Sequence, residues 1–259
     1  LDLNIQNVVE KYIDQWQAGT GSQQAAVIVM DPDNGEVLAM AATNRYDLNN
    51  PRDLSAYYTE EEIASMDTEA QMEAWNKMWR NFCVSDTYEP GSTQKVFTVA
   101  AALEEGLSNG FEYHDCGGFK EVGGWRIRCV ARNGHGPLTV EEGIMKSCNI
   151  VMMDLAAQMG RDRFSHYQEL FGFGSRTGID LPGEADTKNL VYSVDRMGPT
   201  ELATNSFGQN YNCTMIQMAA AYCSIVNGGS YYEPHVVRQI VNEQGAVVRK
   251  IEPKLVRET

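Results

Sequence analysis

The most informative stretch of this 259-residue sequence is Tyr88-Glu89-Pro90-Gly91-Ser92-Thr93-Gln94-Lys95. Its proline and glycine break the chain, and Ser92 then begins an apolar helix that we expect to end at Gly106. Positions three apart share one face of a helix, so the Lys95 amine can approach the Ser92 hydroxyl. The stretch therefore predicts a serine and a lysine side by side at the start of a helix.

A serine beside a lysine can act as a nucleophile. A serine hydroxyl attacks poorly until a base removes its proton, and a lysine can be that base only where desolvation or nearby positive charge lowers its pKa. The start of a helix adds N–H donors and partial positive charge, which suit a developing oxyanion. However, the S-x-x-K spacing alone also fits a serine that caps the helix and a solvated lysine.

Ser147-Cys148-Asn149 is a second signal for this chemistry. It lies at a break between a short helix, which Thr139 and Glu142 predict through a capping box, and a second helix that ends at Gly160. The S-x-N pattern supplies a hydroxyl that can relay a proton and an amide that can bind a peptide backbone. Such residues at a helix junction are usually caps. Together with S-x-x-K, in this order, they form the combination found in penicillin-binding proteins and β-lactamases.

The chain resembles the transpeptidase domain of class B penicillin-binding proteins, especially the septal and sporulation types. The resemblance covers nearly the whole chain, because further family segments occur in family order. These are Asp31-Pro32, residues 35–40, Gly134-His135-Gly136, and residues 171–174, 177–184 and 219–222. It implies an α/β (α+β) fold of the penicillin-binding protein/serine β-lactamase-like type, with a helical lobe plus a partial antiparallel sheet, in a single domain over residues 1–259.

The resemblance also implies a role for four residues. Ser92 would be the acylated nucleophile and Lys95 the base that activates it. Ser147 would pass a proton towards the leaving group, and Asn149 would hold the backbone of the donor peptide. The family reaction is attack on the D-Ala-D-Ala carbonyl of a peptidoglycan stem peptide, followed by transfer of the acyl group to the amine of a neighbouring stem. β-Lactams mimic the substrate and leave the serine blocked.

Three features depart from the family pattern. Gln94 stands where an apolar residue is usual, which we expect to change only the packing behind the helix, and Asn210 stands where a second glycine is common. No K-[TS]-G occurs in the sequence, and Arg176-Thr177-Gly178 belongs to another family segment. In the family, the K-T-G strand comes later in the sequence than the position that corresponds to Thr259. That strand binds the substrate carboxylate and supplies the second oxyanion donor. We therefore expect a domain incomplete at its C-terminus, and these 259 residues alone to be inactive or barely acylated.

Two other functions compete with a D,D-transpeptidase. A serine β-lactamase or a D,D-carboxypeptidase would share the fold, but the class B segments outside the site argue against both. A non-catalytic β-lactam sensor or a scaffold of the division machinery would share it too. The presence of all four site residues argues against such a non-catalytic module. Gln94 and the absent K-T-G, however, leave this alternative function possible.

The composition indicates an ordinary globular protein. With 43% hydrophobic and 22% charged residues it is neither disordered nor of low complexity, and a net charge of −14 disfavours nucleic acid as a partner. No apolar run approaches the roughly 18 residues of a membrane span. The resemblance implies a parent protein on the extracytoplasmic face of the bacterial membrane, anchored by an N-terminal helix outside this chain. Its expected partners are stem peptides, β-lactams and other proteins of wall synthesis or division.

The six cysteines and four histidines form no C-x-x-C and no H-E-x-x-H pattern. We therefore expect no zinc site and no cofactor. A hairpin centred on Gly123-Gly124 would place Cys116 and Cys129 diagonally on one face. That placement allows either a disulfide, in an oxidising compartment, or two buried hydrophobic side chains. His135 is expected to be structural, because this chemistry needs no imidazole, and no role is assigned to the other histidines.

Periodicity and turn signals predict the remaining elements. They are a helix over 3–18 that ends at Gly19, a hairpin of 25–30 and 36–41, a helix over 61–82 whose Met and Trp side chains join the core, a helix from the Thr214–Gln217 capping box to Asn227, and a hairpin of 236–241 and 246–251.

Overall fold

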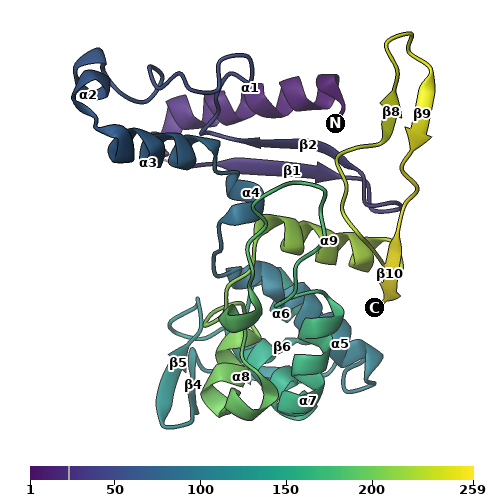
Figure 1. Cartoon of the computed structure of the whole chain (residues 1–259). Coiled ribbons are helices and arrows are strands. Elements are labelled where there is room, and N and C mark those ends of the chain that lie inside the picture. Colours follow the sequence, from purple (N-terminus) through teal and green to yellow (C-terminus); the bar gives the residue numbers. More distant parts are fainter. Residues whose placement is uncertain (23) are drawn as a thin grey trace.

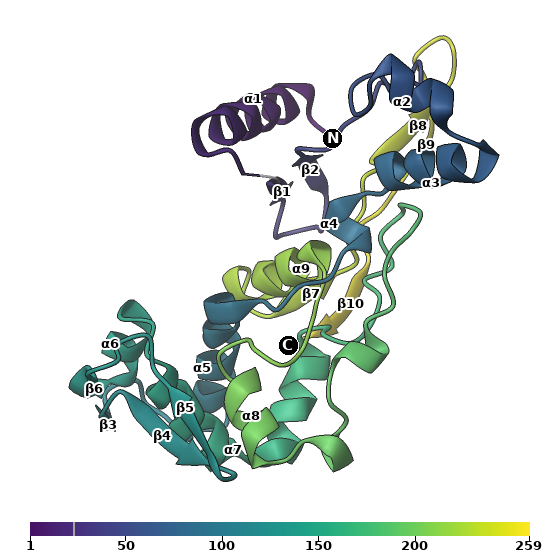
Figure 2. The same cartoon turned by 90° about the vertical axis from the view of Figure 1, so that its left-hand side faces the viewer.

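The computed structural model describes residues 1–22 and 24–259, and its parts follow one another along one axis (Figure 1). A β-hairpin covered by a long helix lies at one end, and a lobe of helices with short antiparallel ladders lies at the other. Helix α9 (Met215–Val226) lies between them in both views and contacts the hairpin (Figure 1 and Figure 2). This arrangement confirms the predicted class, a helical lobe plus partial antiparallel sheet.

The hairpin consists of β1 (Ala26–Met30) and β2 (Val37–Ala42), which pair antiparallel as predicted. Gly35 at φ 79° completes the turn between them, since the left-handed region suits glycine. Every second residue of β2 is buried, as expected for a strand with one face on a core. That core includes residues of α4 (Phe82–Ser85) and α9.

Helix α1 (Leu3–Thr20) packs against β2 and is longer than predicted. It continues through Gly19 to Thr20 and is capped by Gly21, whose φ of 65° lets its N–H donate to the carbonyl of Gln17. Of the apolar side chains of this helix, only Ile13 is fully buried, and Trp16 is exposed. The amphipathic pattern therefore located the helix correctly but overstated how much of it is covered.

The prediction of one helix over residues 61–82 is wrong. Three helices occupy the region: α2 (Glu60–Ser65), α3 (Thr68–Trp79) and α4. Asp67 and Asn81 accept hydrogen bonds from backbone N–H groups two or three residues later, so each starts a new helix. The apolar pattern that predicted one helix thus contains two helix-capping residues, and these residues divide the segment into separate helices.

Trp75 and Trp79 of α3 stack at a centroid distance of 6.1 Å. Their indole N–H groups donate to the carbonyls of Arg52 and Pro51, at 2.9 and 2.6 Å. Both rings pack against a small core formed by Leu54 and two residues of α3. This confirms that they serve packing.

The helical lobe is built around two long helices, α5 (Lys95–Glu104) and α7 (Asn149–Leu170). The predicted break at Gly160 is present at φ 76° and ψ 163°, but the helix resumes after it. The predicted capping box of Thr139 and Glu142 is confirmed. The other members of the lobe are α6 (Val140–Met145), α8 (Pro199–Asn205), η1 (Gly91–Gln94), η2 (Lys188–Leu190) and η3 (Val194–Arg196).

Four short strands complete the lobe in two separate ladders. β4 (Phe119–Val122) and β5 (Trp125–Arg128) form the predicted hairpin around Gly123-Gly124. β3 (Tyr113–Cys116) pairs with β6 (Gly136–Thr139) instead of extending that hairpin. A two-stranded ladder is marginal by itself, so both depend on packing against the helices.

The last part of the chain returns to α9. The predicted capping box of Thr214 and Gln217 starts this helix. β7 (Ser230–Tyr232) follows and pairs with β10 (Leu255–Glu258), while β8 (Gln239–Val241) and β9 (Val247–Lys250) confirm the predicted final hairpin.

Phe97 of α5 joins these parts through aromatic contacts. Its ring lies 4.9 Å from that of Phe171, 5.3 Å from Phe173 and 5.0 Å from Tyr222, all tilted or edge-on. Such pairs stabilise by about 0.5–1.5 kcal/mol each beyond their buried area. They fix the helix that carries the S-x-x-K motif against α7 and α9.

Within the part of the chain that the structure describes, no helix combines the length and apolar character needed to cross a bilayer.

Candidate active site

Ser92 lies in a tight 3₁₀ turn, η1, and Lys95 is the first residue of the α-helix that follows. The turn is held by a close approach of two main chains: the Gly91 N–H donates to the Gly208 carbonyl at 2.7 Å. A Cβ added to Gly208 would lie 2.0 Å from the Gly91 oxygen. Only glycine fits there, and this support for Ser92 was not predicted from the sequence.

The predicted serine, lysine and second serine are brought together. The Ser147 hydroxyl donates to Ser92 Oγ at 2.9 Å, and Lys95 Nζ donates to Ser147 Oγ at 2.8 Å. Lys95 Nζ also donates to the Ser147 carbonyl at 2.7 Å. Among the described residues, the lysine thus connects to Ser92 through Ser147, whereas the sequence suggested a direct contact.

Lys95 is only 3% exposed, and no carboxylate lies within ion-pair distance of its amine in the described part of the chain. Desolvation lowers the pKa of Lys95 from 10.5 to about 8, although the thiols of Cys129 and Cys148 act in the opposite direction. A buried amine without a counter-charge gives up its proton more readily. A useful fraction of Lys95 is therefore neutral near pH 7 and able to accept a proton.

Ser147 adopts a left-handed backbone conformation with φ 53°. For a residue other than glycine this conformation costs about 1–2 kcal/mol. It is held by the junction of α6 and α7, where the Cys148 N–H donates to the Gly143 carbonyl at 2.7 Å. Strain of this kind accumulates at functional sites, and here it directs the Ser147 hydroxyl at Ser92.

Asn149 begins α7 and is buried. Its side-chain amide donates to the carbonyl of Arg128, at the end of β5, at 3.0 Å. The structure thus gives this amide a partner within the protein and joins the S-x-N segment to the β4–β5 hairpin. Its expected contact with a bound peptide stays a prediction.

The family model described as the penicillin binding protein transpeptidase domain matches residues 25–259. The chain belongs to this family. Stage V sporulation protein D of Bacillus subtilis is 36% identical over 244 residues, which cover 93% of this chain and 34% of that protein. Penicillin-binding protein PbpB of Mycolicibacterium smegmatis is 30% identical over 257 residues, covering 99% and 36%. The chain thus spans about a third of the length of these relatives.

The solved structures agree. Penicillin-binding protein 3 of Mycobacterium tuberculosis, complexed with aztreonam, has a TM-score of 0.82 at 28% identity, covering 99% of this chain and 52% of that one. The similarity to class B proteins that the motifs indicated is therefore confirmed for this penicillin-binding protein transpeptidase domain.

The two residues that depart from the family pattern, Gln94 and Asn210, each have a structural reason. Gln94 is 2% exposed, and its side-chain oxygen accepts a hydrogen bond from the hydroxyl of Tyr211. Asn210 has φ 66°, a left-handed conformation that asparagine tolerates better than most residues. Its side-chain amide donates to the hydroxyl of Thr204 at 3.2 Å. Each unusual side chain therefore satisfies a local requirement.

Arg176-Thr177-Gly178 forms part of a turn held by Glu184. Both carboxylate oxygens of Glu184 accept backbone N–H groups, from Thr177 at 2.6 Å and from Gly178 at 3.2 Å. These contacts support the view that this sequence is not a displaced K-T-G strand.

The cysteines are arranged differently from the prediction. All six are free, and Cys116 pairs with Gly136 in the β3–β6 ladder, not along the β4–β5 hairpin. The sequence patterns also did not indicate a further grouping. Cys116, Cys129, Cys148 and His135 lie together beside the S-x-N segment.

Proposed function

We propose that this chain is the catalytic part of a penicillin-binding D,D-transpeptidase that cross-links peptidoglycan stem peptides through an acyl-enzyme on Ser92. The observation that carries the proposal is the chain of contacts from Ser92 through Ser147 to the buried amine of Lys95. Several relatives are named peptidoglycan D,D-transpeptidases, among them MrdA of Escherichia coli, 30% identical over 262 residues.

The contacts support a definite route for the proton. With Lys95 neutral, the two hydroxyls rotate so that Ser92 donates to Ser147 Oγ and Ser147 donates to the Lys95 amine, the reverse of the hydrogen-bond directions in the structure. As the Ser92 oxygen attacks the substrate carbonyl, its proton then passes to Ser147 Oγ, and Ser147 passes its own proton to Lys95. When the acyl-enzyme forms, the same chain returns a proton to the departing D-Ala amine. The Ser92 N–H, at the start of a turn without an intrahelical acceptor, is positioned to support the oxyanion. Asn149 is the candidate for holding the donor peptide.

The domain over residues 1–259 is proposed to need a further strand. No K-[TS]-G occurs in it, and removing a single oxyanion donor typically lowers the rate about 10²–10³-fold. A longer parent polypeptide would supply this strand, together with an anchor that places the domain on the extracytoplasmic face of the membrane. Its partners there would be stem peptides, β-lactams and other wall-synthesis or division proteins.

Intact-mass spectrometry after treatment with benzylpenicillin tests the proposal. In a parent polypeptide that contains the K-T-G strand, one adduct on Ser92 is expected, and Ser92→Ala should abolish it, while Thr93→Ala, a neighbour in the same turn, should retain it. The 259-residue chain should be acylated little or not at all.

Each alternative has its own result. An adduct that water removes within seconds would indicate a serine β-lactamase, and release of D-Ala without transfer to an amine would indicate a carboxypeptidase. Absence of any adduct from the parent polypeptide would overturn the proposal in favour of a non-catalytic module. Complete acylation of the 259-residue chain would contradict only the need for a further strand.

A further inference from the structure

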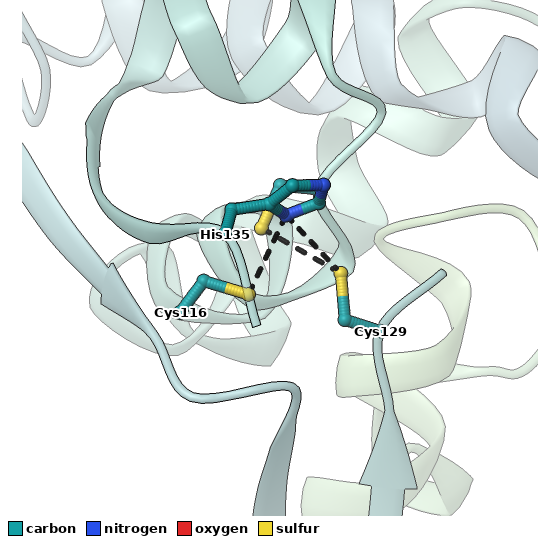
Figure 3. Close-up of side chains that lie close together, drawn as sticks. Cys116, Cys129 and His135 are labelled. Atoms are coloured by element: carbon teal, nitrogen blue, oxygen red, sulfur yellow. Dashed lines mark hydrogen bonds between the residues drawn. The ribbon is translucent and has the colours of Figure 1, made fainter. Parts of the chain in front are cut away.

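Three cysteines and one histidine meet in a buried cluster next to Ser147. Figure 3 shows Cys116, Cys129 and His135 of this cluster. The Sγ atoms of Cys116, Cys129 and Cys148 and a ring nitrogen of His135 all lie within 4.8 Å of one another. The three cysteines are at most 2% exposed. The proposed acyl transfer uses none of these four side chains, so their convergence requires a separate explanation.

Three distances in the cluster fit the edges of a tetrahedron around a metal ion. Cys129 Sγ lies 3.8 Å from Cys148 Sγ, and His135 Nδ1 lies 3.5 Å from Cys116 Sγ and 3.7 Å from Cys129 Sγ. With Zn–S bonds of about 2.3 Å and Zn–N bonds of about 2.0–2.1 Å, tetrahedral geometry requires S···S edges of about 3.8 Å and S···N edges of about 3.6 Å. The three separations match these edges, and all four ligand atoms lie within 4.8 Å of one another.

The backbone is shaped to bring His135 to the cysteines. Gly134 and Gly136, on either side of it, have φ of 84° and 74°. A Cβ on Gly134 would lie 2.2 Å from the Cys116 carbonyl oxygen, so the two loops touch through their main chains. This accounts for the Gly-His-Gly segment: glycines permit the approach, and in Figure 3 the imidazole points to the sulfurs of Cys116 and Cys129.

A disulfide explains the cluster less well, because it would shorten one S···S distance to about 2.05 Å and leave a third cysteine and the imidazole without a function.

We propose that Cys116, Cys129, His135 and Cys148 bind one structural zinc ion. Three thiolates and one imidazole form a Cys₃His donor set, which is typical of closed zinc sites with all four positions filled by protein. Softer thiolate ligands disfavour Mg²⁺ and Ca²⁺. The ligands come from the end of β3, the segment after β5, the residue before β6 and the start of α7. Sequence spacing therefore did not reveal them.

The ion would act on the site through Cys148. This residue stands between Ser147 and Asn149, so a metal bond to its sulfur would hold the S-x-N segment in place. It would also join the two short ladders of the lobe to the start of α7, which neither ladder can secure alone. Zinc is thus assigned a positioning role for Ser147, and it takes no part in the proton transfers.

Metal content tests this proposal independently of enzymatic activity. The chain is produced with added zinc under reducing conditions, dialysed, and assayed by inductively coupled plasma mass spectrometry; about one zinc per chain is expected. Reconstitution with Co²⁺ should give thiolate-to-cobalt charge-transfer bands and the intense visible absorption of tetrahedral cobalt. This spectrum needs no variant, so it stays decisive if variants fold poorly.

Variants then assign the ligands. Cys129→Ser and Cys148→Ser should each reduce the zinc content to near zero, and His135→Ala should weaken the retention of zinc against a chelator. Cys223→Ala, on α9 and outside the cluster, is the matched control and should retain the metal. Zinc that survives Cys129→Ser, a wild-type chain that binds no zinc, or a Cys129–Cys148 disulfide formed in the presence of reductant and zinc would each overturn the proposal.

Discussion

Ser147 and Ser92 are 55 positions apart in the sequence, yet the hydroxyl of the first donates to that of the second at 2.9 Å. The contact depends on the left-handed conformation of Ser147, at φ 53°. A right-handed residue at this junction would direct its side chain elsewhere. Backbone strain and the proposed proton relay therefore belong to the same residue, and substitution can separate them.

Ser147→Gly and Ser147→Ala both remove the hydroxyl but differ in strain. Each should lower the rate of acylation of the parent polypeptide by about 10²–10⁴-fold, the usual contribution of a proton-transfer group. Glycine adopts φ 53° freely, so Ser147→Gly should be more stable than Ser147→Ala by about 1 kcal/mol. Urea denaturation measures the difference, and equal stabilities would contradict the assigned strain.

The rate of acylation should depend on the charge of Lys95. Desolvation lowers the pKa of Lys95 to about 8, and only the neutral amine accepts a proton. The rate should therefore rise with pH and level off above about pH 8, falling about tenfold for each pH unit below it. A fluorescent penicillin measures the rate between pH 6 and 9.5.

Lys95→Arg provides the control for this profile. Arginine keeps its charge throughout this range, so the variant should react slowly at every pH. A wild-type rate that is constant from pH 6 to 9, or that falls as pH rises through 8, would exclude Lys95 as the base.

The elements of the fold could be predicted from the sequence where one local signal decided them. The capping boxes at Thr139 and Thr214 and the Gly123-Gly124 turn are present as expected. The prediction of a single helix over 61–82 was wrong because Asp67 and Asn81 cap new helices within one apolar pattern. Local patterns do not show which of two competing signals prevails.

The site was predictable to the extent that its motifs are short. S-x-x-K and S-x-N identified Ser92, Lys95 and Ser147, which the fold brings into one hydrogen-bonded chain. What the motifs could not show is the path from lysine through Ser147, because it depends on a backbone angle. The cysteine–histidine cluster was missed because its members come from four separate segments.

Gln94 offers a test of a buried polar pair. Its oxygen accepts the Tyr211 hydroxyl inside an aromatic core. Gln94→Leu should destabilise by about 1–3 kcal/mol, because the hydroxyl loses its partner in a buried setting. The double variant Gln94→Leu/Tyr211→Phe should recover most of that loss, as measured by urea denaturation. Additive effects of the two substitutions would show that the hydrogen bond contributes nothing.

Gly208→Ala and Gly228→Ala differ in one respect. Both positions have positive φ, 82° and 85°, but a Cβ meets the Gly91 main chain only at Gly208 and has open space at Gly228. Gly228→Ala should cost about 1–2 kcal/mol from the backbone angle alone, and Gly208→Ala about 1–3 kcal/mol more. Only Gly208→Ala should also slow acylation, since it displaces the turn that bears Ser92. Similar losses in both variants would contradict this role of the close approach.

The contact between Gly91 and Gly208 also has a consequence for the order in which the protein is made. The turn bearing Ser92 leaves the ribosome more than a hundred residues before the glycine against which it rests. A nascent chain that has just completed both S-x-x-K and S-x-N therefore carries Ser92, Lys95 and Ser147 without the support for its proposed nucleophile. Reactivity towards penicillin should thus arise only after Gly208 has been synthesised, as a late event of translation.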